Sequence, residues 1–102
     1  MFRYSIYGQV QMGKWRQFFE LYEKLDEQLQ AKKLVRRQLW APTVGTNNSF
    51  VLVADHETID GWDRDSTAFQ TDGEVMDLWR KIFELLEESP TDELMQTASQ
   101  IA

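Results

Sequence analysis

A short apolar run near the middle of the chain constrains the fold most. The segment "SFVLVA" at 49–54 is apolar at every position from Phe50 to Ala54 and does not alternate with polar residues. Successive side chains of a strand point to opposite faces of the sheet, so this strand is covered on both faces. One layer of helices covers one face. We therefore expect a second copy of the chain to cover the other face, which makes the protein a homodimer.

Two other extended segments predict strands that pair with this run. The segment "FRYSIYGQV" at 2–10 alternates at a period of two, with Tyr4 on one face and Tyr7 on the other. The runs 35–44 and 49–54 are separated by Gly-Thr-Asn-Asn at 45–48. Glycine and asparagine tolerate positive φ, so the two runs predict a hairpin. Pro42 cannot donate to a ladder and indicates a sheet edge.

Two amphipathic segments predict helices on one face of the sheet. The first follows Gly13, carries an aromatic stripe and is expected to end near Lys33 or Leu34. A short helical segment follows Thr58, and Asp72 is expected to cap a second long helix that Pro90 ends. Its inward residues are expected to be Val75, Met76, Trp79, Ile82, Phe83 and Leu86.

The C-terminal segment is open to two interpretations. Ser89-Pro90 followed by Asp92 and Glu93 resembles the start of a helix. The order strand-helix-strand-strand-helix lacks one strand, however, and we therefore predict a strand at about 93–101. The expected fold is one α+β domain over residues 1–102, a ferredoxin-like βαββαβ unit with a four-stranded antiparallel sheet.

Composition excludes several classes of function. The net charge of −6 argues against nucleic acid as a partner, because binding it needs a basic surface. The chain has no cysteine, which excludes disulfides, thiolate metal sites and a cysteine nucleophile. Neither a signal-peptide pattern nor an apolar run of about 20 residues is present. We expect a cytoplasmic protein that does not associate with membranes.

The stretch "VLVADHETIDGWDRDSTAF" at 51–69 has the strongest signs of chemistry. His56 is the one histidine of the chain and is a candidate proton-transfer group. Alternation from Phe50 puts His56 on the face of Leu52, and hairpin geometry is expected to bring Gln38 and Trp40 to that face. The alternative is a histidine at a strand end that is partly exposed to solvent.

The carboxylates of this stretch are Asp55, Glu57, Asp60, Asp63 and Asp65. Asp63, Asp65, Thr67 and Glu74 match calcium-loop spacing, but Ala68 stands where such a loop requires glycine. Capping of helix N-termini explains the carboxylates better, with Asp60 or Asp63 as the expected cap. No metal site is predicted.

The chain resembles the dimeric α+β barrel proteins, which include the antibiotic biosynthesis monooxygenases and the NIPSNAP-like proteins. The resemblance is carried by "FRYSIYGQV", the aromatic helix after Gly13, the hairpin through Val53 and "IDGWDRDSTAF…DLWRKIFELL". It implies two sheets packed face to face, helices outside, and a pocket between sheet and helices in each protomer. It also implies that Trp62 roofs the pocket.

The resemblance sets the expected function and site. We expect a small-molecule-binding protein without a cofactor, either a monooxygenase or isomerase acting on an aromatic or polyketide-like compound, or a ligand-binding or interaction module without catalysis. Tyr4, Tyr7, Trp40 and Trp62 are expected to form an aromatic slot for a flat ligand. Arg37, His56 or a tyrosine is expected to handle protons.

Overall fold

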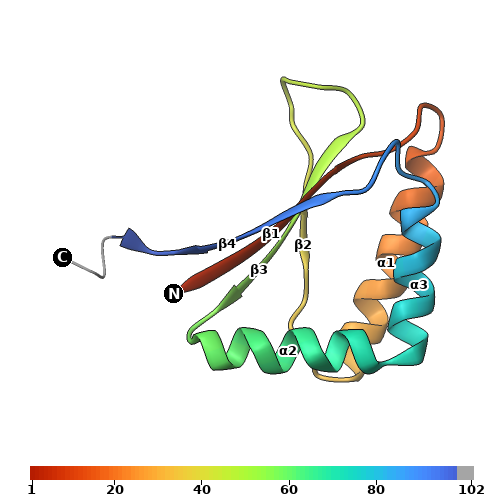
Figure 1. The fold of residues 1–102 in the computed structure, drawn as a ribbon. Helices are drawn as coiled ribbons and strands as arrows, with labels where there is room; N and C mark the ends of the chain where they lie inside the picture. The colour runs from red at the N-terminus through yellow and green to blue at the C-terminus, as the bar shows by residue number, and fades with distance from the viewer. Residues whose placement is uncertain (99–102) are drawn as a thin grey trace.

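Four antiparallel strands form one sheet with the helices packed against one of its faces (Figure 1). The computed structural model describes residues 1–98. The strands are β1 (Phe2–Gln9), β2 (Gln38–Trp40), β3 (Ser49–His56) and β4 (Thr91–Gln96), in the sheet order β2-β3-β1-β4. The α+β, ferredoxin-like arrangement predicted from the sequence is confirmed.

The helices lie where the apolar periodicity predicts them. They are α1 (Trp15–Ala31), α2 (Ile59–Thr71) and α3 (Gly73–Phe83), with α1 and α3 side by side and α2 running across the end of the sheet (Figure 1). The core between sheet and helices consists of Val10, Phe18, Leu25, Leu29, Phe50, Leu52, Phe69, Val75, Ile82 and Leu86. No helix of residues 1–98 is both long and apolar enough to cross a membrane.

The C-terminal end of α1 directs the following segment toward α2. Lys33 adopts a φ of 57°, and the Leu34 amide donates to the carbonyl of Leu29, which together form a Schellman motif. The helix therefore ends at Ala31, slightly before the expected position. The chain leaves it as an extended segment that leads to Arg37 and β2.

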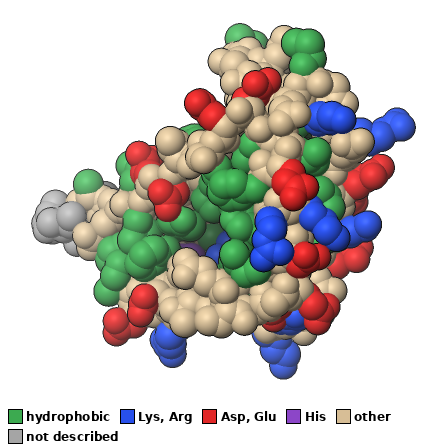
Figure 2. Space-filling model, turned by 45° about the vertical axis from the view of Figure 1, so that its right-hand side comes forward, with side chains coloured by type: hydrophobic (Ala, Val, Ile, Leu, Met, Phe, Trp, Pro, Cys, Tyr) green, Lys and Arg blue, Asp and Glu red, His purple; other side chains and the backbone are tan. Residues whose placement is uncertain are grey.

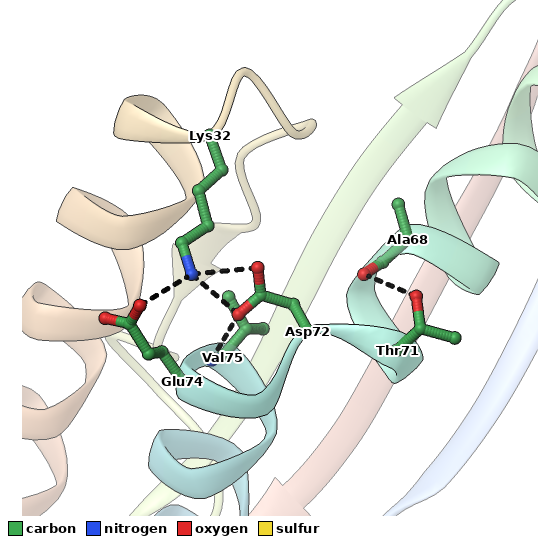
Figure 3. Close-up of polar contacts among 6 residues, drawn as sticks. All are labelled: Lys32, Ala68, Thr71, Asp72, Glu74 and Val75. Carbon is green, nitrogen blue, oxygen red and sulfur yellow. Dashed lines mark hydrogen bonds and ion pairs between the residues drawn. The ribbon is translucent and has the colours of Figure 1, made fainter.

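The junction between α2 and α3 is held by charged groups (Figure 3). Asp72 caps α3 by accepting from the Val75 amide, as predicted, and also accepts from Lys32 Nζ at 2.7 Å. Lys32 Nζ lies near Glu74 as well, so the end of α1 is tied to the start of α3. The hydrogen bond with Lys32 lowers the pKa of Asp72 below its usual value.

Several boundaries differ from those predicted. Thr58, not Asp60 or Asp63, caps α2 by accepting from the Gly61 amide. The strand expected over 35–44 is limited to Gln38–Trp40, because Pro42 follows closely and cannot donate to the ladder. The turn after it does contain the expected positive φ angles, at Gly45 and Asn48.

The C-terminal part of the described chain also corrects two expectations. Helix α3 ends at Phe83, well before Pro90, because the next residues form backbone hydrogen bonds with the end of β1 and the residues after it. Gln11 N donates to Leu85 O, and Glu87 N donates to Gln9 O. Phe83 itself is 39% exposed and does not point inward. The tail is a strand, as predicted, but it begins at Thr91, and the expected strand positions 99–101 lie outside the described residues.

Gly8 provides a test of the core packing between β1 and β3. A Cβ at Gly8 would lie 2.7 Å from Cζ of Phe50, whose buried ring packs on Phe18 with centroids 4.6 Å apart. Because the ring has no room to withdraw, we expect Gly8→Ala to lower the free energy of unfolding by about 1–3 kcal/mol. Urea denaturation measures this change. Gly73→Ala is the matched control, since its added Cβ would meet nothing within 4 Å beyond its chain neighbours and its own helix backbone. Equal losses would contradict the packing argument.

Candidate functional site

The strand register decides which residues face the helices. Tyr4 pairs with Ala54, and Leu39 pairs with Leu52, so these side chains share the helix-covered face with His56. Trp40 pairs with Val51 and therefore lies on the opposite, open face, as does Gln38. The expectation that Gln38 and Trp40 share a face with His56 is wrong, because the hairpin register is offset by one residue from the one assumed.

Three polar side chains form a buried cluster beneath α2: Arg37, His56 and Asp65. Asp65 Oδ2 lies 2.8 Å from Arg37 Nη2 and 3.3 Å from His56 Nε2, while Asp65 Oδ1 accepts from the Val35 amide at 3.0 Å. Arg37, His56 and Asp65 are only 5%, 6% and 7% exposed. The cluster therefore joins the segment before β2, the end of β3 and the middle of α2.

Local structure explains how these residues meet. Along α2, Trp62, Asp65 and Phe69 recur at spacings of three and four, which places them on the helix face toward the sheet. Phe69 supports Arg37 directly, with the guanidinium carbon 4.6 Å from the ring centroid. The guanidinium also donates to the Val35 carbonyl. Arg37 is thus held by an ion pair, a ring and the backbone.

The carboxylate of Asp65 sets the protonation pattern of His56. An arginine is always charged in a protein, and a carboxylate that pairs with it can only accept hydrogen bonds. His56 Nε2 must therefore be the protonated nitrogen that donates to Asp65. Within residues 1–98, His56 Nδ1 is buried without a hydrogen-bond partner, and so is Trp62 Nε1.

A pocket of about 360 Å³ opens beside this cluster, between the sheet and helices α2 and α3. The space-filling view shows it as a hollow bordered by hydrophobic side chains (Figure 2). It is lined by Tyr4, Ile6, Arg37, Ser66, Phe69, Gln70, Met76 and Trp79. Phe69 and Trp79 meet edge to face with centroids 6.0 Å apart, which gives the pocket an aromatic wall.

Tyr4 contributes a polar group to the pocket. Its hydroxyl donates to Asp92 of β4 at 2.7 Å, and its ring lies 5.9 Å from that of Trp62. Burial, assisted by the hydrogen bond with the Asp92 carboxylate, raises the pKa of Tyr4 to about 12. Tyr4 is therefore a neutral hydrogen-bonding group at neutral pH.

The structure separates the expected aromatic slot into two pairs. Tyr4 and Trp62 lie together on the helix-covered face, whereas Tyr7 and Trp40 lie on the open face. Tyr7 donates there to Glu93. The four rings do not form one slot, because Tyr4 and Tyr7 are an odd number of residues apart on one strand and therefore point to opposite faces of the sheet. Contact of each ring with a ligand stays a prediction.

Two site features were missed or misread in the sequence. Asp65 is not a capping carboxylate, because it lies inside α2 and is buried. The sequence feature that could have indicated its burial is its position between Trp62 and Phe69 on the apolar stripe of the helix. His56 is not partly solvated but buried against Asp65. Among residues 1–98, no group of three or more His, Asp or Glu could hold a metal ion.

Comparison with known proteins places the fold. An uncharacterised NIPSNAP domain protein from Burkholderia xenovorans superposes with a TM-score of 0.80 at 17% identity, over 97% of this chain and 96% of that one. A NIPSNAP family protein of unknown function from Agrobacterium tumefaciens gives 0.79 at 17% identity, over 96% and 88%. A structure described as an antibiotic biosynthesis monooxygenase gives 0.75 at 15% identity, over 96% and 99%.

The chain has the fold of these proteins. The predicted resemblance to antibiotic biosynthesis monooxygenase-like and NIPSNAP-like proteins is thereby confirmed for the fold over nearly the whole chain. No protein-family model matches the chain, and no curated protein matches its sequence. At such low identity the likeness concerns architecture, and the function has to be argued from the site.

The buried ion pair yields a stability prediction. Asp65→Ala leaves the Arg37 charge buried without its partner, so we expect it to lower the free energy of unfolding by about 3–5 kcal/mol. Asp63→Ala, at an exposed position of the same helix, is the control and should change it by less than about 0.5 kcal/mol. Urea denaturation measures both variants. A similar small effect in each would show that Asp65 is not structurally important.

Proposed function

We propose that the protein binds a small, flat and largely apolar molecule in the pocket between the sheet and α2–α3. The observation that carries this proposal is the pocket itself, about 360 Å³ in volume, with an aromatic wall and a few fixed polar groups. Binding sites for small molecules commonly combine these features. The polar groups are the Arg37 guanidinium and the hydroxyl groups of Tyr4 and Ser66.

Ligand binding can be tested by filling the pocket. Ser66 lines the pocket, whereas the neighbouring Thr67 is exposed and does not. We expect Ser66→Phe to abolish binding of the methyl ether of β-naphthol, because the added ring occupies the ligand's volume. Thr67→Phe should leave binding unchanged. Energy transfer from tryptophan to the naphthalene ring measures binding. Equal binding by the two variants, or none by the wild type, would contradict the proposal.

For a catalytic form of this function, we propose a cofactor-free monooxygenase or isomerase acting on an aromatic or polyketide-like compound. The fold shared with a structure described as an antibiotic biosynthesis monooxygenase supports it. A non-catalytic binding module is the second candidate, since the fold is shared equally with an uncharacterised NIPSNAP domain protein. Liquid chromatography with mass spectrometry of the added compound distinguishes them. Oxygenation without a cofactor adds one oxygen atom and removes two hydrogens, because the second atom of O2 leaves as water; isomerisation keeps the mass but changes the retention time, and a binding module changes neither.

We further propose that the protein acts as a homodimer through the open face of the sheet. This face carries exposed apolar side chains, with Tyr7 42%, Trp40 56% and Met95 54% exposed. On this face Arg3 forms bidentate hydrogen bonds with Asp55, and Glu93 accepts from the Tyr7 hydroxyl group. The bonds with Arg3 lower the pKa of Asp55. A largely apolar sheet face whose charged side chains are already hydrogen-bonded suits a second sheet.

A pair of valine substitutions tests the dimer. Val53 lies half-buried on the open face, and Val44 lies in the loop after β2, where it is 92% exposed. We expect Val53→Glu to convert the dimer to monomer, because the carboxylate would be buried between the sheets. Val44→Glu should leave it dimeric. Sedimentation velocity at micromolar concentration measures the assembly. A monomeric wild type would exclude this dimer.

A further inference from the structure

A separate pocket lies at the end of the molecule opposite α2. It has a volume of about 300 Å³ and is lined by Trp15, the first residue of α1, and by every residue of 41–49 except Val44. Most of these residues belong to the loop between β2 and β3, which projects beyond the end of the sheet (Figure 1). This pocket shares no lining residue with the one between the sheet and α2–α3.

The loop is longer than a tight hairpin requires, and it folds back on itself. It has eight residues, 41–48, whereas hairpin loops commonly have about two to five. Ser49 Oγ donates to the carbonyl of Thr46, and a Cβ at Gly45 would lie 3.2 Å from Cβ of Pro42. Compact surface loops of this length frequently carry a function.

Two hydrogen bonds hold the loop against the end of β1. Gln9 Nε2 donates to the carbonyl of Asn47 at 3.3 Å, and the Val10 amide donates to the carbonyl of Asn48 at 2.8 Å. Asn48 adopts a φ of 62°, which asparagine tolerates better than most residues. Because these contacts use backbone carbonyls, they fix the loop and leave both side-chain amides available. A site that is ordered before binding loses less entropy when a ligand binds.

The polar side chains of this pocket have unused hydrogen-bonding groups. Among residues 1–98, no hydrogen bond involves the side-chain amides of Asn47 and Asn48 or the hydroxyl groups of Thr43 and Thr46. An amide offers two donors and an acceptor oxygen, and a hydroxyl group both donates and accepts. All the lining residues are uncharged. The pocket therefore suits a neutral molecule with several hydroxyl groups better than an ion.

Trp15 gives the pocket an apolar wall. It is half-buried, and its ring packs on Phe18 with centroids 5.2 Å apart, which holds the indole in place from the core side. An indole has a large flat apolar surface, against which the C–H face of a pyranose ring can pack. The hydroxyl groups at the rim of a pyranose are both donors and acceptors, and they match the amides and hydroxyl groups of the loop.

We propose that this pocket binds a neutral saccharide. One sugar ring packs against Trp15, and its hydroxyl groups form hydrogen bonds with the side-chain amides of Asn47 and Asn48. This site is independent of the function proposed for the other pocket, because the two pockets are lined by different residues.

Nuclear magnetic resonance with ¹⁵N-asparagine tests the site directly. Asn47 and Asn48 are the two asparagines of the chain, so every labelled signal reports on this loop. The methyl glycosides of glucose, galactose, mannose and N-acetylglucosamine are titrated separately, with adenosine as a flat, heteroaromatic comparison. We expect at least one glycoside to shift the side-chain amide signals with a Kd of about 1 mM, the affinity of a few hydrogen bonds and one ring contact. No shift with any glycoside, or a shift with adenosine alone, would overturn the proposal.

Three substitutions in the loop locate the bound sugar. Asn47→Ala keeps the backbone carbonyl that Gln9 contacts, and Asn48→Gly keeps the positive φ. We expect each to weaken binding of the glycoside about fivefold, the value of one hydrogen bond. Val44→Ala is the control in the same loop and should leave binding unchanged, since Val44 does not line the pocket. Saturation-transfer difference signals of the glycoside measure all three variants. Equal binding by all three would place the sugar elsewhere and overturn the proposal.

Ser66→Phe distinguishes this site from the pocket between the sheet and α2–α3. We expect it to leave glycoside binding unchanged while it abolishes binding of the methyl ether of β-naphthol, and we expect Asn47→Ala to leave binding of the ether unchanged. If Ser66→Phe abolishes glycoside binding, the sugar occupies the other pocket and the saccharide site proposed here is wrong. If the glycoside binds as expected but the ether does not bind the wild type, the saccharide site stands and the proposed pocket function fails.

Discussion

The site depends on the hydrogen bonds and the ion pair that the Asp65 carboxylate forms. This carboxylate accepts from the Arg37 guanidinium, the His56 imidazole and the Val35 amide, groups that come from the segment before β2 and from the end of β3. A charged group can remain buried only when it is paired and hydrogen-bonded, so these contacts hold one another in place. They fix α2 over the sheet and thereby shape the wall of the pocket.

The two faces of the sheet carry different sets of side chains, because successive residues of a strand point to opposite faces. The helix-covered face carries Tyr4, the buried cluster and the pocket, while the open face carries Tyr7 and Trp40. Side chains alternate strictly along a strand, so a shift of one residue in the β2–β3 register would exchange the faces of Leu39 and Trp40. The short β2 is the element on which this register depends, and Arg37 enters the cluster just before it begins.

The site combines a pocket with a polar cluster at its base. Phe69 serves both, since it lines the pocket and lies against the Arg37 guanidinium. Tyr4 of β1 adds a neutral phenol to the pocket, and its hydroxyl group donates to the Asp92 carboxylate of β4. Aromatic walls favour a flat ligand, and a paired arginine gives orientation without attracting anions in general. This combination suits the flat, largely apolar ligand that we propose.

The sequence by itself determined the element order, the α+β fold, the amphipathic helices and the N-terminal cap of α3, because periodicity and capping are local properties of the chain. It also singled out His56, Tyr4, Arg37 and Trp62. The pairing of residues far apart in sequence was decided by the tertiary structure. From the sequence, Asp65 was expected to be one of the capping carboxylates. In the structure, the packing of α2 on the sheet buries it against Arg37. The predicted face of Trp40 was wrong because the register depends on the pairing between strands, which the sequence of one strand does not determine.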